Sequence, residues 1–277
     1  LLLPSHLLCV TGMGGKRKKA ASYHYKDDGQ EEEDSEELNY QKQRHKMWGS
    51  SSSSSNSKRG KGTSRSSSSR PSSNGVNEAI VLKLFNDLAD NDDPTIISME
   101  GISNFCDQLN IDVCSDIRIM VLLWKLGAGK EKPQQISKTE WCEGCVNLET
   151  ESIVQFRNLL PSLETGFLER SEFKSFYKFC FQFSRQGKQT TLDKELVADT
   201  LQLVLKDHVE SERLRTFNEF LAKSTDESYK RVTLDQWTSF LDFCYECNDL
   251  SDYDEATSAW PVLIDDYVDY MLQQNSK

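Results

Sequence analysis

The stretch Ile119-Met-Val-Leu-Leu-Trp124 contains six consecutive apolar residues, and it decides how the surrounding chain is interpreted. Ser115 lies before it and has a hydroxyl that can cap the first turn of a helix. Gly127 lies after it and can adopt the left-handed conformation that ends a helix. A helix that is apolar on every side must be surrounded by other elements. The stretch therefore predicts a helix at the centre of a hydrophobic core.

Apolar stripes with helical spacing lie on both sides of this stretch. Ser137-Lys-Thr-Glu140 and Thr233-Leu-Asp-Gln236 have the capping-box pattern that opens a helix. Ser171 can cap an aromatic-rich helix, and Pro261 suits a first helical position. The helices expected besides the central one cover residues 80–88, 99–109, 138–148, 153–159, 171–183, 193–207, 211–223, 233–247 and 261–272. Few segments alternate with period two, so the predicted fold class is all-α.

Charge divides the chain into two parts. Residues 1–75 hold 13 Lys/Arg and 8 Asp/Glu, and residues 76–277 hold the remaining 20 and 36, which gives net charges of +5 and −16. Between residues 49 and 75, 14 of 27 residues are Ser. Such a segment buries too little apolar surface to offset its ordering entropy. We expect a disordered, Ser-rich, charged segment over 1–75 and one helical domain over 76–277.

The amino-terminal segment contains two further features. Residues 16–19, Lys-Arg-Lys-Lys, are either a solubilising charge run or a nuclear import signal, and the sequence does not separate the two. The first Met is Met13, so we suspect that residues 1–12 are upstream read-through or a fragment end. The expected location is the nucleus, the cytoplasm or both.

The acidic domain narrows the classes of partner. Phosphate binding needs Lys and Arg, so nucleic acid is not expected as the main partner, whereas a basic protein surface is. No apolar run is long enough to cross a membrane, and no membrane partner is expected. No phosphate-binding glycine loop occurs, and His208 has no Ser or Cys nucleophile in a recognisable motif. An enzyme is therefore unsupported, and no cofactor is expected.

Two Cys-x-x-Cys pairs are the strongest candidates for metal or redox chemistry. They are Cys142-Glu-Gly-Cys145 and Cys244-Tyr-Glu-Cys247. Together they could supply four thiolates to zinc, but 98 residues separate them and both fall within predicted helices. No βαβ pattern accompanies them, which disfavours a redox motif. We expect free, reduced thiols and no metal, and we keep a metal-binding or redox protein as an alternative.

Asp90-Asn-Asp92-Asp93 lies between two helical stripes, as the loop of an EF-hand would. A working calcium loop needs Gly at its sixth position and Glu at its twelfth. Counted from Asp90, those positions hold Thr95 and Gly101. We therefore expect a degenerate EF-hand-like front half that does not bind calcium.

The sequence of residues 251–270, Ser-Asp-Tyr-Asp-Glu-Ala-Thr-Ser-Ala-Trp-Pro-Val-Leu-Ile-Asp-Asp-Tyr-Val-Asp-Tyr, combines acids, a small residue and a Trp. Most of these charges fit a solvated helix face, but the combination also fits a dock for a basic protein. The segment closely resembles the carboxy-terminal signature of the "defective in cullin neddylation" family, and residues 101–106, 124–125 and 176–179 are similar to other family segments. The resemblance covers about residues 85–277 and indicates a divergent, plant-type member.

The resemblance implies a non-catalytic scaffold with two binding sites. Such a scaffold would hold a cullin and the neddylation conjugating enzyme together, so that transfer gains from proximity. The family's cullin-binding acid–alanine–acid patch matches Asp235, Ala259 and Asp265, which would pair with basic residues of the cullin carboxy-terminal region. A second site in the family buries the acetylated amino-terminal Met of the conjugating enzyme. Its positions here are Met99, Ile102, Ile119, Leu122, Leu123, Leu126, Ala128, Ile136, Phe183 and Leu203.

The residues of the second site do not by themselves distinguish a binding site from a core, because an apolar set describes both. Leu123 and Leu126 replace a small and an aromatic residue of the animal relatives. The alternative is therefore a cullin-binding regulator that no longer recruits the conjugating enzyme. A monomer is expected in either case.

Deleting residues 1–70 is expected to leave the melting temperature of the protein nearly unchanged, because a disordered segment contributes no packing. Differential scanning calorimetry of the full and shortened chains measures this. A large drop in melting temperature would show that the segment is structured.

Overall fold

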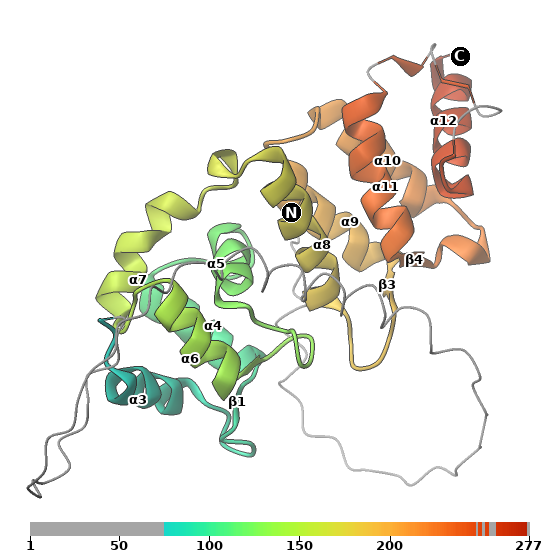
Figure 1. Ribbon diagram of the computed structural model, residues 1–277. Helices are drawn as coiled ribbons and strands as arrows, with labels where there is room; N and C mark the ends of the chain where they lie inside the picture. Colours follow the sequence, from blue (N-terminus) through green and yellow to red (C-terminus); the bar gives the residue numbers. More distant parts are fainter. Residues whose placement is uncertain (1–74, 248, 251–252, 255–258, 276–277) are drawn as a thin grey trace, which may run out of the picture. The chain divides into compact units, whose positions relative to one another are not determined.

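The computed structural model describes residues 75–247, 249–250, 253–254 and 259–275 (Figure 1). Except for Gly75, the segment predicted to be disordered lies outside the described residues, and so do Cys9 and the basic residues 16–19. The described part is mostly helical, with two small two-stranded sheets. The all-α prediction is confirmed.

The front half contains two helix–loop–strand–helix units. Its elements are α3 (Glu78–Leu88), β1 (Ile96–Ile97), α4 (Met99–Leu109), α5 (Arg118–Leu126), β2 (Ile136–Ser137) and α6 (Lys138–Asn147). The strands pair antiparallel, with Ile97 opposite Ile136. Paired helix–loop–helix units joined by a short ladder are the arrangement that the EF-hand-like prediction described for this half.

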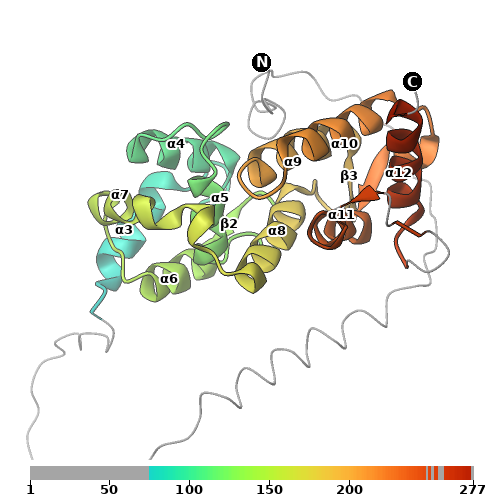
Figure 2. The same ribbon diagram turned by 90° about the horizontal axis from the view of Figure 1, so that it is seen from above.

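The back half repeats this order. A connector leads from the front half to the back half, and it consists of α7 (Ile153–Leu159), η1 (Leu160–Leu163) and η2 (Thr165–Phe167). The elements of the back half are α8 (Arg170–Ser184), β3 (Thr191–Asp193), α9 (Lys194–Leu205), α10 (Ser211–Lys223), η3 (Glu227–Tyr229), β4 (Arg231–Thr233) and α11 (Leu234–Glu246) (Figure 2). An additional helix, α12 (Val262–Asn275), follows them. Strands β3 and β4 pair antiparallel. The sequence did not reveal this second unit, because its loops lack the acidic pattern and its strands are only three residues long.

Helix α5 occupies the core as predicted. Five successive side chains, those of residues 119–123, are buried, and Gly127 ends the helix with φ of +75°. The prediction that Ser115 caps this helix is wrong, because the helix begins after Ile117. The Ser115 hydroxyl instead donates to the Asp112 carboxylate, 2.9 Å away, in the preceding turn.

Both predicted capping boxes are present, but Ser171 and Pro261 do not hold the predicted positions, since α12 begins at Val262, one residue after Pro261. Ser137 and Thr233 form complete capping boxes with Glu140 and Gln236. Ser171 is not a cap, because Glu169 occupies that position in α8 and its carboxylate serves the same purpose. Either side chain satisfies amides that the first helical turn leaves unpaired.

In each half, one buried tryptophan connects the fourth helix to the first helix by a hydrogen bond. Trp141 of α6 donates its indole N–H to the Val81 carbonyl of α3 at 3.2 Å. Trp237 of α11 donates to the Tyr177 carbonyl of α8 at 3.0 Å, and the Tyr177 hydroxyl donates back to the Trp237 carbonyl. Donor and acceptor lie 60 residues apart in both halves. The two halves therefore share a tertiary constraint as well as an order of elements.

Buried residues from both halves form one hydrophobic cluster. Trp124 of α5 packs against Phe176 of α8 with ring centroids 5.8 Å apart, which joins the halves through the central helix. Within the described residues, no helix has both the length and the apolar character needed to span a bilayer.

Replacing Gly101 or Gly144 with Ala is expected to destabilise the fold by about 1–3 kcal/mol, the range for overpacking. The added Cβ would lie 2.2 Å from the Leu88 carbonyl oxygen in one case and 2.5 Å from that of Leu126 in the other. This clash outweighs the gain in helix propensity of about 1 kcal/mol. Urea unfolding measures the change.

Gly166→Ala is the matched control, because a Cβ at Gly166 meets no atom within 4 Å. Its free energy of unfolding should stay within about 0.5 kcal/mol of the unsubstituted protein. Equal stability of all three variants would contradict the tight helix contacts.

Candidate functional site

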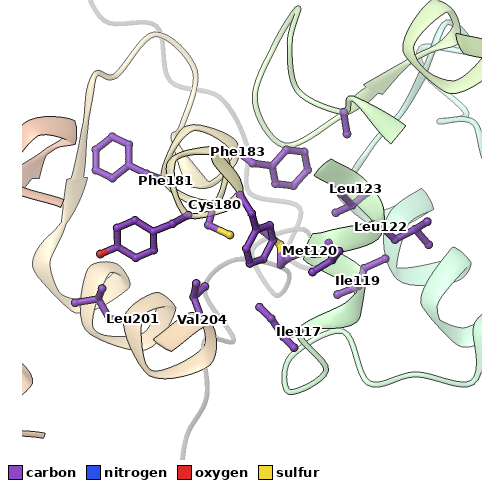
Figure 3. Packing of buried hydrophobic residues seen from close by; sticks show 14 of the residues in the cluster. Ile117, Ile119, Met120, Leu122, Leu123, Cys180, Phe181, Phe183, Leu201 and Val204 are labelled. Carbon is purple, nitrogen blue, oxygen red and sulfur yellow. The ribbon is translucent and has the colours of Figure 1, made fainter. Parts of the chain in front are cut away.

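A small apolar cavity lies where the two halves meet. Helices α4, α5, α8 and α9 and the loop after α4 enclose it, and its volume is about 40 Å³. Figure 3 shows side chains of α5 facing those of α8 and α9 across this junction. The lining residues are Met99, Ile102, Val113, Cys114, Ile119, Met120, Leu123, Phe183, Ser184, Thr200, Leu203 and Val204.

Six of the ten positions that the resemblance assigned to this site line the cavity. They are Met99, Ile102, Ile119, Leu123, Phe183 and Leu203. The other four, Leu122, Leu126, Ala128 and Ile136, are fully buried elsewhere in the core. Leu122 and Leu126 are four residues apart on α5 and therefore share a face, and Leu126 contacts Gly144 of α6. Since α5 is apolar all round, its sequence alone could not tell the cavity face from the core face.

The sequence missed several lining residues. Thr200 stands three residues before Leu203 on α9, and Val204 stands four residues after Thr200, so helical spacing extended from Leu203 through Thr200 could have found both. Ser184 and Thr200 were also overlooked because only apolar positions were considered. Met120 stands three residues before Leu123 on α5, so the same spacing could have found it, whereas the loop residues Val113 and Cys114 had no distinguishing signal.

The cavity favours a neutral, apolar occupant. The Ser184 hydroxyl donates to the Cys180 carbonyl at 2.8 Å, and the Thr200 hydroxyl donates to the Leu196 carbonyl at 2.7 Å. Both donors are therefore engaged within their own helices. No carboxylate lines the cavity, so an ammonium group would be buried there without a counter-charge, which is costly.

The volume of the cavity is small compared with that of sites for small ligands, which is about 300–1,000 Å³. Four lining residues, Met99, Val113, Cys114 and Leu203, are half-buried, whereas the rest of the lining is fully buried. Entry of a side chain therefore requires wall residues to move, and these four have the most freedom to do so.

The second candidate site is an acidic surface around α11 and α12. Asp235 lies in the first turn of α11 and is exposed, and Ala259 is exposed before α12. Asp265 lies in the first turn of α12 and is half-buried, where its carboxylate accepts a hydrogen bond from the Tyr253 hydroxyl. Two acids and a small residue are thus presented near the starts of two neighbouring helices.

Aromatic contacts hold this surface in place. Trp260 packs edge-on against Phe243 of α11 at 6.1 Å, and Tyr267 of α12 packs against the same ring. The Tyr229 hydroxyl donates to Asp266, which ties α12 to the segment leading into α11. Asp235 lies about 12 Å along the helix axis from Phe243, at about 1.5 Å per residue. Asp235 and Asp265 lie in the first turns of two different helices, so a partner must contact both α11 and α12 to reach both carboxylates.

The cysteine pairs lie as the sequence predicted, within or at the end of helices. The described cysteines are all free of disulfides. Burial raises the pKa of Cys145 and of Cys244 to about 12 each, so both are protonated at neutral pH. Among the described residues, no three His, Cys, Asp or Glu side chains come together in a group that could hold a metal ion.

The loop after α3 uses its acids to fix its own conformation. The Asp90 carboxylate accepts backbone N–H bonds from Asp92 and Asp93, and the Asp93 carboxylate accepts the Thr95 N–H. The pKa of Asp90 is lowered, chiefly by a hydrogen bond from the Ser98 side chain and then by the two backbone hydrogen bonds from Asp92 and Asp93. These carboxylates therefore stabilise the turn that leads into β1.

Comparison with known proteins places the chain in a family. A profile described as "Cullin binding" matches residues 155–270, a range that includes Asp235, Ala259 and Asp265. DCN1-like protein 4 of Danio rerio is 33% identical over 190 residues, which are 68% of this chain and 64% of that protein. The human DCN1-like protein 4 is 32% identical over 68% of this chain and 61% of its own length.

The matched stretch thus spans less than two thirds of these two relatives. It spans more of DCN1-like protein 5 of Rattus norvegicus, which is 30% identical over 65% of this chain and 73% of that protein. The similarity extends beyond the profile, over most of the helical part. The chain therefore belongs to the family of DCN1-like proteins.

Proposed function

We propose that this protein is a non-catalytic scaffold that promotes cullin neddylation by holding a cullin and the neddylation conjugating enzyme together. The observation that carries the proposal is the overlap between the cullin-binding profile and the acidic surface of α11 and α12. The proposed role is positioning, because the rate of transfer rises when donor and acceptor are held in a reactive geometry.

The acidic surface suits a basic cullin segment. Exposed Asp235 and half-buried Asp265 offer carboxylates to Lys or Arg, and Ala259 between them in sequence lets a partner approach closely. Trp260 and Phe243 beneath the surface keep it rigid, which reduces the entropy lost on binding. We assign cullin docking to this surface.

The apolar cavity suits the acetylated amino-terminal Met of the conjugating enzyme. Acetylation removes the ammonium charge that the cavity cannot neutralise. A Met side chain is flexible and fills irregular apolar spaces. The same cavity residues would also discriminate against an unacetylated amino terminus.

The small volume of the cavity favours a second candidate function. A cavity of about 40 Å³ has to widen to admit a Met side chain. If it does not, the protein binds a cullin without recruiting the conjugating enzyme and acts as a regulator. The two functions share the acidic surface and differ only in the cavity.

We further propose a monomer in which residues 76–277 form the functional domain, located in the nucleus, the cytoplasm or both. The basic residues 16–19 support the nuclear part of this proposal.

Ala259→Arg should weaken cullin binding at least tenfold, because it adds bulk and a positive charge where a basic partner docks. Isothermal titration with a cullin carboxy-terminal fragment measures the affinity. Val154→Arg, which adds the same charge at an exposed site on α7, is the matched control and should bind normally. Unchanged affinity of Ala259→Arg would refute the assignment of this surface.

Leu203→Arg should abolish binding of an acetylated peptide from the amino terminus of the conjugating enzyme, because it places a charge at the cavity wall. Gln202→Arg adds the same charge to the exposed side of α9 and should leave affinity unchanged. Fluorescence anisotropy with a labelled peptide measures both. Absence of binding by the unsubstituted protein would favour the regulator instead.

Single-turnover transfer from charged conjugating enzyme to the cullin fragment tests the whole proposal. The scaffold predicts faster transfer in the presence of the protein and loss of this effect in Ala259→Arg and Leu203→Arg. Cullin binding without faster transfer indicates the regulator, and neither effect contradicts both functions.

A further inference from the structure

The two carboxylates of the acidic surface are held in different ways. The Asp265 side chain is half-buried in the first turn of α12, and its Oδ1 atom accepts a hydrogen bond from the Tyr253 hydroxyl. Asp235 is exposed in the first turn of α11, and its carboxylate forms no hydrogen bond or ion pair within the part of the chain that the structure describes. Of the two carboxylates, that of Asp265 is fixed before a partner arrives.

Tyr253 has anchors of its own besides Asp265. Its ring packs edge-on against Phe243 of α11, with the ring centroids 5.9 Å apart, and its backbone N–H donates to the Leu250 carbonyl at 3.3 Å. The Phe243 ring is itself buried and also contacts Trp260. Helices α11 and α12 pack against each other (Figure 1), so the Tyr253 hydroxyl is presented to the start of α12 from a support on α11.

A fixed carboxylate and a free one contribute differently to binding. A side chain that is already immobilised loses little rotamer freedom when a partner docks, and this loss otherwise costs affinity. An exposed charge mainly raises the association rate, whereas a partly buried, hydrogen-bonded charge mainly slows dissociation. Asp235 is therefore suited to attracting a basic partner, and Asp265 to retaining it.

We propose that Tyr253 is a positioning residue of the acidic surface, and that its hydroxyl holds the Asp265 carboxylate in the orientation that binds a Lys or Arg of the partner. This inference rests on the proposed docking of a cullin to the surface. An ionised carboxylate has about four lone-pair sites, so one bond from Tyr253 leaves acceptors for the partner.

Tyr253→Phe isolates the contribution of the hydroxyl, because it keeps the ring against Phe243 and removes only the donor to Asp265. Surface plasmon resonance at several salt concentrations measures binding of a cullin carboxy-terminal fragment to the full chain. The dissociation rate should rise about two- to tenfold, the range for ordering one further side chain on binding. The association rate and its salt dependence should stay unchanged.

Asp235→Asn should show the opposite pattern. Removing an exposed charge should lower the association rate and weaken its dependence on salt, because exposed charges act at long range and are screened by salt. The dissociation rate should change less than in Tyr253→Phe. This split between the two rates separates positioning of a carboxylate from a general loss of negative charge.

Tyr245→Phe is the matched control for loss of a tyrosine hydroxyl. Tyr245 is a half-buried residue of α11 whose ring packs against the Arg170 guanidinium at 4.4 Å, rather than against an acid of the surface. Both of its rates should equal those of the unsubstituted protein. Equal melting temperatures of the two Phe variants and the unsubstituted protein would exclude a loss of fold as the cause of faster dissociation.

A double substitution tests whether Tyr253 acts through Asp265. In a chain that carries Asp265→Ala, Tyr253→Phe should cause no further rise in the dissociation rate, because the hydroxyl then has no carboxylate to hold. The single and double variants are compared at low ionic strength, where opposite charges attract most strongly.

Equal dissociation rates of Tyr253→Phe and the unsubstituted protein would overturn the inference, and so would additive effects of Tyr253→Phe and Asp265→Ala. If Ala259→Arg still weakens binding in these cases, the proposed cullin surface stands and only the role of Tyr253 fails. Absence of binding by the unsubstituted protein would instead overturn the proposed docking and this inference together.

Discussion

The buried indole of Trp141 or Trp237 fixes the geometry of each half. In both places an N–H on the last helix of a four-helix unit donates to a backbone carbonyl on the first, and the ring fills the space between them. Removing such a side chain costs about 3–5 kcal/mol in packing, and it leaves a buried polar group unsatisfied. The capping box four residues before each Trp sets where its helix begins and therefore where the indole points.

The position of α5 follows from this constraint. Once α3 and α6 are fastened together, α5 packs one face against α6, where Gly144 permits close approach, and another face toward α8. At the contact between α5 and α8, the side chains come from two halves that are each stabilised by their own buried Trp. These side chains do not fill the space between the halves completely. The apolar cavity is thus a consequence of joining the two halves, which explains why its walls come from α4 and α5 of one half and from α8 and α9 of the other.

The acidic surface depends on a different kind of support. Helix α12 has no counterpart in the front half, and it attaches through aromatic rings, with Tyr267 contacting Phe217, Phe240 and Phe243. Its carboxylates face outward or accept hydrogen bonds from tyrosines. Rigid aromatic support with exposed charge above it is well suited to a partner that binds by electrostatic complementarity. Three of the seven described cysteines, Cys106, Cys145 and Cys180, are buried and contribute packing.

The sequence by itself determined the helices, two capping boxes, the central α5 and the acidic character of the α11–α12 region, because each depends on residues that are close in the chain. It also carried the family resemblance in residues 251–270. It could not determine that the back half repeats the front, because strands of three residues have no periodic signal. Nor could it determine which apolar residues line the cavity, since Leu122 and Leu123 are chemically alike and only the packing of α6 on one side and α8 on the other distinguishes them. The cavity is a space left between packed helices, and such a space exists only once the tertiary structure has formed.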